Sequence, residues 1–196
     1  MKKIPTMFER DWEGDRSLVL DNPNPECAWV FAGEGVATRK YDGMACMFDG
    51  ATWFKRREIR DEDVAKKGLP PGFVEADRDD TTGKRVGWVP IGDGPEDKYL
   101  REAIEVTADN SECQVGRAPS IGTYEFLGPK SQGNVEREFT CNQMWAHAAA
   151  ERYPDVSRTF DGIRAFLTDR DIEGIVFHHP DGRMAKIKKR DFGLKR

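Results

Sequence analysis

The chain has 196 residues, which suffices for one well-filled core and is short for two. Hydrophobic residues make up 38%, charged residues 34%, and the net charge is −4, a balance typical of a soluble globular protein and unlike a general nucleic-acid coat. No apolar run is long enough to cross a bilayer, and no apolar block follows the first lysines, so we expect a cytoplasmic protein without a membrane span or signal peptide.

The first 25 residues are polar and rich in Asn, Asp and Pro, which predicts an extended lead-in anchored by Phe8, Trp12 and Leu18-Val19-Leu20. Residues 27–31 (Cys-Ala-Trp-Val-Phe) predict a buried strand that the following glycines end. The cysteines are widely spaced and never form Cys-x-x-Cys, so we expect reduced packing residues instead of zinc ligands or a disulfide framework; they are Cys27, Cys46, Cys113 and Cys141.

Further strands are predicted at residues 36–41, 44–48, 52–57 and 87–91. The middle two flank Asp49-Gly50 and predict a β-hairpin with a tight turn. Residues 60–85 are charged and contain Pro and Gly, which predicts a long surface loop.

In the second half, Pro95 is placed for the first turn of a helix that runs to about Val106. A strand is predicted at 121–127, and helices at 141–153 and 157–168, the second capped by Ser157. Two strands around Pro180-Asp181-Gly182 predict a final hairpin, at residues 172–178 and 184–188. The predicted class is α+β in one domain, with antiparallel-rich sheets and flanking helices.

Lys40-Tyr41-Asp42-Gly43 ends the second predicted strand. A lysine amine can attack the α-phosphate of a nucleotide, and the glycine lets the backbone approach a ligand closely. The same four residue types also occur in ordinary surface turns. The motif therefore needs support from other residues.

That support comes from the final hairpin. Alternation along the strand places Lys186 and Lys188 on one face, where both can reach the same phosphate; the alternative is an edge strand with two solvated lysines. Glu173 stands among apolar neighbours and needs a partner such as a metal ion or the amine of Lys40, unless it is a surface residue at the strand end. Glu125 lies similarly between Tyr124 and Phe126.

Further cations lie near these motifs. Arg56 and Arg57 end the hairpin arm nearest Lys40 and could contact a ribose or a 5′-phosphate, or could be ordinary surface residues. The C-terminal end is basic on an acidic protein, which indicates a local anion site or a solvated tail; its cations are Arg183, Lys186, Lys188, Lys189, Arg190, Lys195 and Arg196.

These motifs resemble, in type and order, those of the covalent nucleotidyltransferases, the ligases and capping enzymes. The segments that carry the resemblance are Lys40-Tyr41-Asp42-Gly43, Glu125, Glu173-Gly174-Ile175-Val176 and Lys186-Ile187-Lys188. The motif sequences most resemble those of the RNA ligase 1 family, which are ATP-dependent 5′-3′ RNA ligases. Two further segments share this resemblance, Gly87-Trp88-Val89-Pro90 and Glu125-Phe126-Leu127-Gly128. The resemblance spans most of the chain. It implies an ATP-grasp-like, nucleotidyltransferase adenylation domain over residues 1–196, without the C-terminal OB-fold of larger ligases.

The resemblance also implies roles for single residues. Lys40 would carry AMP as a phosphoramide, and Glu125 would hold the ribose or orient the lysine. Glu173 would be the residue on the side of the site where Mg²⁺ or Mn²⁺ binds. Lys186 and Lys188 would bind the α-phosphate and the leaving group. Asp42 would help to order the loop of the Lys40 motif around the adenylate, and Gly43 would belong to the same nucleotide-binding set. Arg56 or Arg57 would contact the ribose, and Phe139 or Trp145 would stack on adenine.

The reaction implied is ATP-dependent sealing of an RNA 5′-phosphate to a 3′-hydroxyl. Two alternatives stay open at this point. One is a GTP-dependent guanylyltransferase that caps RNA, and the other is an inactive module that binds nucleotide or RNA.

Overall fold

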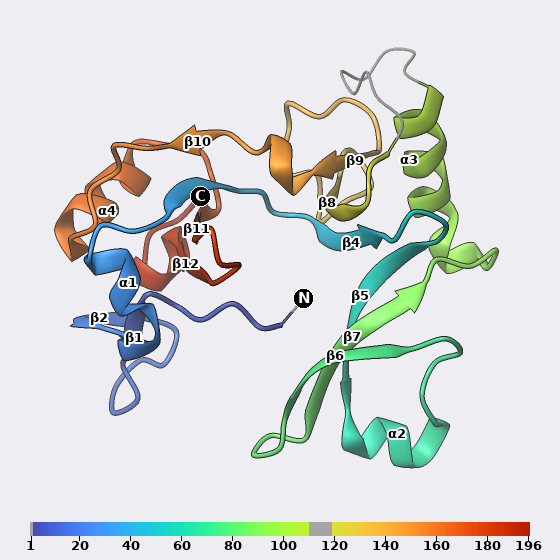
Figure 1. Cartoon of the computed structure of the whole chain (residues 1–196), viewed down its shortest axis with the longest axis horizontal. Coiled ribbons are helices and arrows are strands. Elements are labelled where there is room, and N and C mark those ends of the chain that lie inside the picture. Colours follow the sequence, from blue (N-terminus) through green and yellow to red (C-terminus); the bar gives the residue numbers. More distant parts are fainter. Residues whose placement is uncertain (1, 110–118) are drawn as a thin grey trace. The chain divides into compact units, whose positions relative to one another are not determined.

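The computed structural model describes residues 2–109 and 119–196 (Figure 1). The chain divides into two compact units that interleave along the sequence. Ile4–Tyr41 and Ala150–Arg196 form what we call the terminal unit, and Asp42–Ala149 with residues 2–3 form the central unit. Both are built mainly on antiparallel strands with few helices, which confirms the predicted α+β class. The assignment of residues 1–196 to one adenylyltransferase domain stays a prediction.

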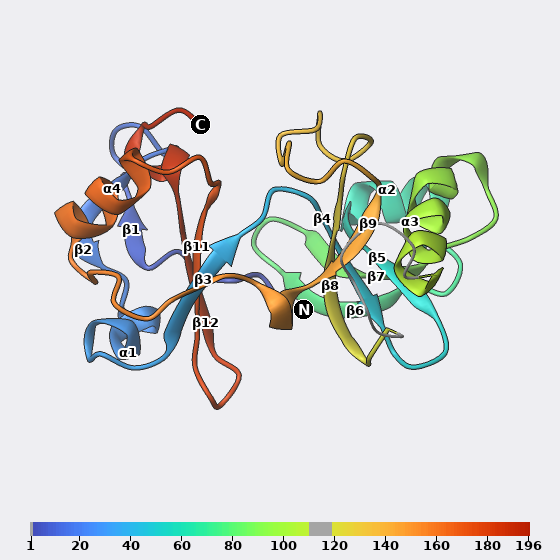
Figure 2. The same cartoon turned by 90° about the horizontal axis from the view of Figure 1, so that it is seen from above.

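The terminal unit contains a four-stranded antiparallel sheet (Figure 2). Its strands are, in spatial order, β10 (Arg152–Tyr153), β3 (Val36–Lys40), β11 (Gly174–His178) and β12 (Met184–Lys188). β3 is the predicted strand that ends at Lys40, and β11 pairs with β12 as the predicted hairpin. Alternation gives this sheet one apolar face, formed by Ala37, Ile175, Phe177, Ala185 and Ile187. The lysines lie on the opposite face.

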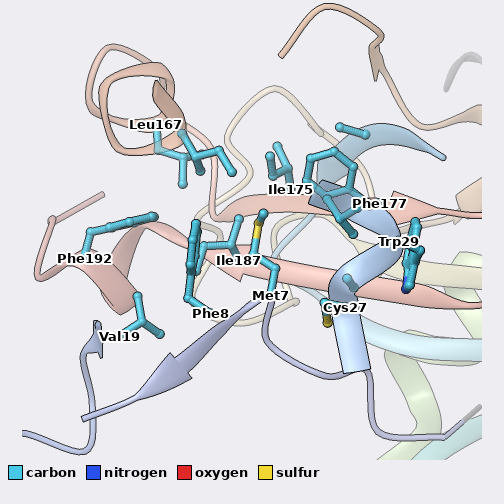
Figure 3. Packing of buried hydrophobic residues seen from close by; sticks show 14 of the residues in the cluster. Met7, Phe8, Val19, Cys27, Trp29, Leu167, Ile175, Phe177, Ile187 and Phe192 are labelled. Atoms are coloured by element: carbon cyan, nitrogen blue, oxygen red, sulfur yellow. The ribbon is translucent and has the colours of Figure 1, made fainter. Parts of the chain in front are cut away.

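The apolar face packs into the core of the terminal unit (Figure 3). A hairpin of β1 (Phe8–Arg10) and β2 (Val19–Pro23) contributes Phe8, and the preceding Met7 is fully buried beside it. Helix α4 (Phe160–Thr168) contributes Ile163 and Leu167, and the short 3₁₀ turn η4 (Lys189–Phe192) contributes Phe192. This packing holds β11 and β12 in a fixed register.

The lead-in is partly as predicted. Phe8 and Val19 are buried, but Trp12 is 67% exposed and Leu20 is 47% exposed, so these two anchors were predicted wrongly. Successive residues of a strand point to opposite faces, and Leu20 therefore turns outward next to the buried Val19. Trp12 lies in the connection between the two strands.

The predicted strand at 27–31 is wrong. The structure has a 3₁₀ turn, η1 (Pro25–Cys27), followed by one turn of helix, α1 (Ala28–Phe31). The Asn24 side chain accepts a hydrogen bond from the Glu26 amide, and Pro25 occupies the first turn, which are the usual signals of a helix start. Burial of this segment was predicted correctly, because Cys27, Trp29 and Val30 belong to the core.

Helix α4 is confirmed, but its cap lies two residues later than predicted, at Thr159. The Thr159 hydroxyl accepts a hydrogen bond from the Gly162 amide at 3.2 Å. The Ser157 hydroxyl instead forms a hydrogen bond with the Thr159 hydroxyl, with the two oxygens 3.0 Å apart.

The central unit contains a six-stranded antiparallel sheet. Its strands are, in spatial order, β6 (Val74–Asp79), β7 (Lys84–Pro90), β5 (Trp53–Arg60), β4 (Met44–Phe48), β8 (Gly122–Leu127) and β9 (Gln143–Ala146). Helix α3 (Lys98–Asp109), preceded by η2 (Pro95–Asp97), lies beside this sheet (Figure 2). Its Leu100 and Ala103 belong to the core cluster on one face of the sheet. The hairpin around Asp49-Gly50, the strand at 121–127 and the helix from Pro95 are confirmed.

The long loop predicted at 60–85 is wrong. This segment forms helix α2 (Asp61–Lys67), strand β6 and the start of β7. The helix has acidic residues in its first turn and Lys66 and Lys67 in its last, which suits the helix dipole. The Asp61 carboxylate also accepts hydrogen bonds from Arg85 at 2.5 Å and Arg78 at 3.0 Å, so charged residues order this segment.

The helix predicted at 141–153 is also wrong. The segment forms β9, a 3₁₀ turn η3 (His147–Ala149) and β10. β9 pairs with β8 in a register that sets Trp145 opposite Glu125. Pairing with a neighbouring strand therefore overrides the local helical pattern.

Two cysteines agree with the prediction and one does not. Cys27 and Cys46 are free and buried, and burial raises the pKa of the Cys27 thiol to about 11. Cys141 is disulfide-bonded, so the prediction of a reduced thiol is wrong there; Cys113 lies outside the described residues. Within residues 2–109 and 119–196, no helix has the length and apolar character needed to cross a membrane.

Candidate active site

Two lysines of the terminal unit share one carboxylate. Lys40 and Lys188 lie directly opposite Gly174, one on each side of β11, so their side chains project from the same face of the sheet. Gly174 puts no side chain between them. Glu173 takes this space: its Oε2 accepts a hydrogen bond from Lys40 Nζ at 2.5 Å, and its Oε1 accepts one from Lys188 Nζ.

The three side chains are mostly withdrawn from solvent, with exposed fractions of 22% for Lys40, 13% for Glu173 and 14% for Lys188. Burial alone would raise the pKa of Glu173, but the charges of Lys40 and Lys188 outweigh it and hold that pKa below its usual value. Glu173 therefore stays ionised at neutral pH.

Lys186 is the third cation of this face. It lies opposite Val176, and alternation along β12 puts it on the same side as Lys188. Burial, and then the charges of Lys188 and Lys40, lower the pKa of Lys186 to about 8. In the described part of the chain no group accepts a hydrogen bond from its Nζ. Two negative charges act on Lys186, those of Asp191 and Glu173, and Asp191 is itself paired with Arg10. Positive side chains therefore outnumber carboxylates here, which suits this face to bind an anion.

A second set of polar residues lies in the central unit. Glu125, on β8, is 7% exposed; its Oε1 accepts a hydrogen bond from the Gly43 amide at 3.1 Å, and its Oε2 lies 2.8 Å from His147 Nε2. His147 Nδ1 lies 2.9 Å from the Thr123 hydroxyl. Glu136, 2% exposed, accepts a hydrogen bond from the Asp42 amide at 2.8 Å. Two buried carboxylates thus hold consecutive peptide groups directly after Tyr41.

Sequence reasoning missed Glu136 and His147. Both are distant in sequence from Lys40-Tyr41-Asp42-Gly43, and neither stands in a recognisable motif. His147 follows β9, a segment predicted as helix, and a helix there would not bring His147 beside Glu125.

The backbone at Gly43 leaves no room for a side chain. A Cβ there would lie 2.3 Å from the Phe126 carbonyl oxygen and 2.7 Å from Glu125 Cγ. We expect Gly43→Ala to lower the free energy of unfolding by about 1–3 kcal/mol, because β8 must shift. Chemical denaturation measures this.

Gly92→Ala is the matched control in the same unit, since its Cβ would meet only Asp97 Oδ2, at 3.9 Å. We expect this change to alter stability by less than about 0.5 kcal/mol. Equal effects of the two substitutions would contradict the close approach at Gly43.

The strand register distinguishes the two arginines. Phe54 lies opposite Met47, which lies opposite Thr123, so Arg56 shares the sheet face of Thr123 and Glu125. Arg57 belongs to the other face and is exposed. The Arg56 Nε is buried, and none of the described residues accepts a hydrogen bond from it. Arg56 is the better candidate of the two.

The two predicted aromatic residues lie together. Trp145 is opposite Glu125 and therefore shares its face, and Phe139 packs edge-on against Trp145 with ring centroids 5.2 Å apart. Stacking on adenine stays a prediction for both.

The basic end of the chain offers fewer free cations than expected. Lys189 is buried and donates a hydrogen bond to the Arg170 carbonyl at 2.6 Å, so its predicted place in an exposed anion site is wrong. Arg183 pairs with Asp181 at 2.7 Å, and Arg196 with Asp171 at 3.2 Å.

Across residues 2–109 and 119–196, no group of three His, Cys, Asp or Glu side chains is arranged to hold a metal ion. Among these described residues, Glu173 therefore belongs to no such group of three. Comparisons with protein-family models and with curated proteins found no match to this chain.

Proposed function

We propose that the protein is an ATP-dependent RNA ligase with the adenylation fold of the covalent nucleotidyltransferases. The observation that supports this most strongly is the sheet face on which Lys40 and Lys188 bind Glu173, with Lys186 on the same face. It combines an amine at a strand end with an excess of positive charge, as nucleotidyl transfer through a lysine requires.

In the first step, Lys40 gives up one proton of its ammonium group to water, and the neutral amine attacks the α-phosphorus of ATP. An N–P bond forms, the bond from the α-phosphorus to the bridging oxygen breaks, and pyrophosphate leaves with the electron pair and takes up the proton lost by the amine. Lys186 and Lys188 neutralise the charge that develops on the phosphates. Glu173 fixes Lys40 and Lys188 on either side of Gly174.

Mg²⁺ or Mn²⁺ is compatible with these residues. Mg²⁺ commonly binds one or two carboxylates and completes its shell with water and substrate phosphates, and Glu173 can supply one carboxylate. The ion would help to neutralise the triphosphate. Because both Glu173 oxygens bind lysines, an ion there would have to share the carboxylate with Lys40 or Lys188.

The later steps follow the resemblance. AMP passes from Lys40 to an RNA 5′-phosphate, and a 3′-hydroxyl then attacks the activated phosphate and releases AMP. In the central unit, Glu125 and Arg56 would contact the ribose, Asp42 and Gly43 would order the adenylate, and Trp145 or Phe139 would stack on adenine.

Incubation of the protein with α-labelled ATP or α-labelled GTP, followed by a denaturing gel, tests the proposal. We expect covalent label from ATP only, and its transfer to RNA bearing a 5′-phosphate. Label from GTP would favour a guanylyltransferase, and label from neither nucleotide would favour an inactive binding module.

Lys186 predicts a pH dependence of ATP binding. Its pKa of about 8 in the free protein means that it loses its charge above that pH, whereas a bound triphosphate would stabilise the charged form. Affinity for α,β-methylene-ATP, which cannot release pyrophosphate, should fall by up to about tenfold per pH unit above 8. Calorimetry at several pH values measures this.

Arginine keeps its charge over this range, so Lys186→Arg should remove the pH dependence. Lys67→Arg, on the exposed end of α2, should keep it. A pH profile shared by wild type and Lys186→Arg would show that another group is responsible.

A further inference from the structure

His147 links two residues of the Glu125 face by hydrogen bonds. Its Nε2 lies 2.8 Å from Glu125 Oε2 and its Nδ1 lies 2.9 Å from the Thr123 hydroxyl. Thr123 and Glu125 are two residues apart on β8 and therefore share a face, and His147 follows β9, the neighbouring strand. The other carboxylate oxygen of Glu125, Oε1, accepts a hydrogen bond from the Gly43 amide.

The Glu125 carboxylate accepts, so the ring donates to it from Nε2. The Thr123 hydroxyl completes the chain in either ring state, because it donates to Nδ1 of a neutral ring and accepts from Nδ1–H of a charged one. Both oxygens of Glu125 are thereby fixed in place, and each keeps a lone pair that is not used by these contacts. Such a carboxylate can receive further hydroxyl donors without turning.

We propose that His147 is a positioning residue that holds Glu125 ready to accept hydrogen bonds from the ribose hydroxyls of a nucleotide. The inference rests on the proposed function, because it takes Glu125 as the ribose contact. It adds to that function a residue in no motif, and a specificity for ribonucleotides over 2′-deoxyribonucleotides.

Two substitutions test the two hydrogen bonds of His147 one at a time. The amide nitrogen of glutamine can occupy the place of Nε2, and that of asparagine the place of Nδ1. His147→Gln therefore keeps a donor for Glu125, whereas His147→Asn keeps only a group near Thr123. A role limited to packing would make the two variants alike.

The experiment measures binding of ATP and of 2′-deoxy-ATP by calorimetry to wild type, H147Q and H147N, with thermal unfolding to show that each is folded. We expect wild type to prefer ATP by about tenfold or more, since a charge-assisted hydrogen bond is lost with the deoxy compound. H147Q should keep most of this preference and H147N should lose it. Glu125→Gln serves as the reference for a weakened carboxylate.

An unchanged preference in H147N, or an equal loss in both variants, would overturn the positioning role. The binding readout does not require chemistry, so it stands apart from the self-adenylation assay. Self-adenylation by wild type together with an unchanged preference in H147N would overturn only this inference, whereas failure to bind any adenine nucleotide would overturn both.

Discussion

Lys40→Ala and Lys40→Arg should abolish covalent labelling by α-labelled ATP. Alanine removes the nucleophile, and arginine keeps the positive charge beside Glu173 but cannot give up a proton near neutral pH. The two variants thus distinguish loss of the nucleophile from loss of charge. The label retained on a denaturing gel measures the result.

Lys67→Ala is the matched control, because Lys67 is exposed on α2, and it should label as wild type does. Both Lys40 variants should still seal pre-adenylated RNA without ATP, since that substrate bypasses the first step. Persistent labelling of Lys40→Ala would remove Lys40 from the mechanism, and loss of sealing would indicate a damaged fold.

Glu173→Gln should slow self-adenylation by at least about a hundredfold. The substitution keeps the shape of the side chain but removes the charge that orients Lys40 and Lys188. Lys188→Ala should have an effect of similar size, since it removes a cation from the phosphate-binding face. Single-turnover rates with labelled ATP measure both.

Glu13→Gln is the control for Glu173, because Glu13 is an exposed glutamate of the same unit. It should leave the rate unchanged. Normal adduct formation by Glu173→Gln or by Lys188→Ala would mean that the shared carboxylate is structural only.

The fold was predictable where local patterns agreed with strand pairing. The β11–β12 hairpin has turn residues between two alternating segments, and its register brings Lys186 and Lys188 to one face, as alternation predicted. The helix prediction for residues 141–153 was wrong because there the local pattern and the strand pairing disagree. Its residues also suit a helix, and only the pairing of β9 with β8 makes it a strand.

The candidate site was predictable to the same extent. Lys40 and Glu173 are 133 positions apart, and their contact was foreseen as an alternative because a buried carboxylate needs a partner. Glu136 and His147 could not be foreseen, since their contacts with Asp42 and Glu125 depend on the path of the chain between strands. The choice of Arg56 over Arg57 likewise required the register of β5.

Adenylylation of Lys40 is tested most directly by the mass of the intact protein after incubation with ATP and Mg²⁺ or Mn²⁺, followed by peptide mapping. We expect a gain of one AMP per chain, located on the peptide that contains Lys40, in a phosphoramide that is labile in acid and stable in alkali. Absence of an adduct, or an adduct on another residue, would contradict it.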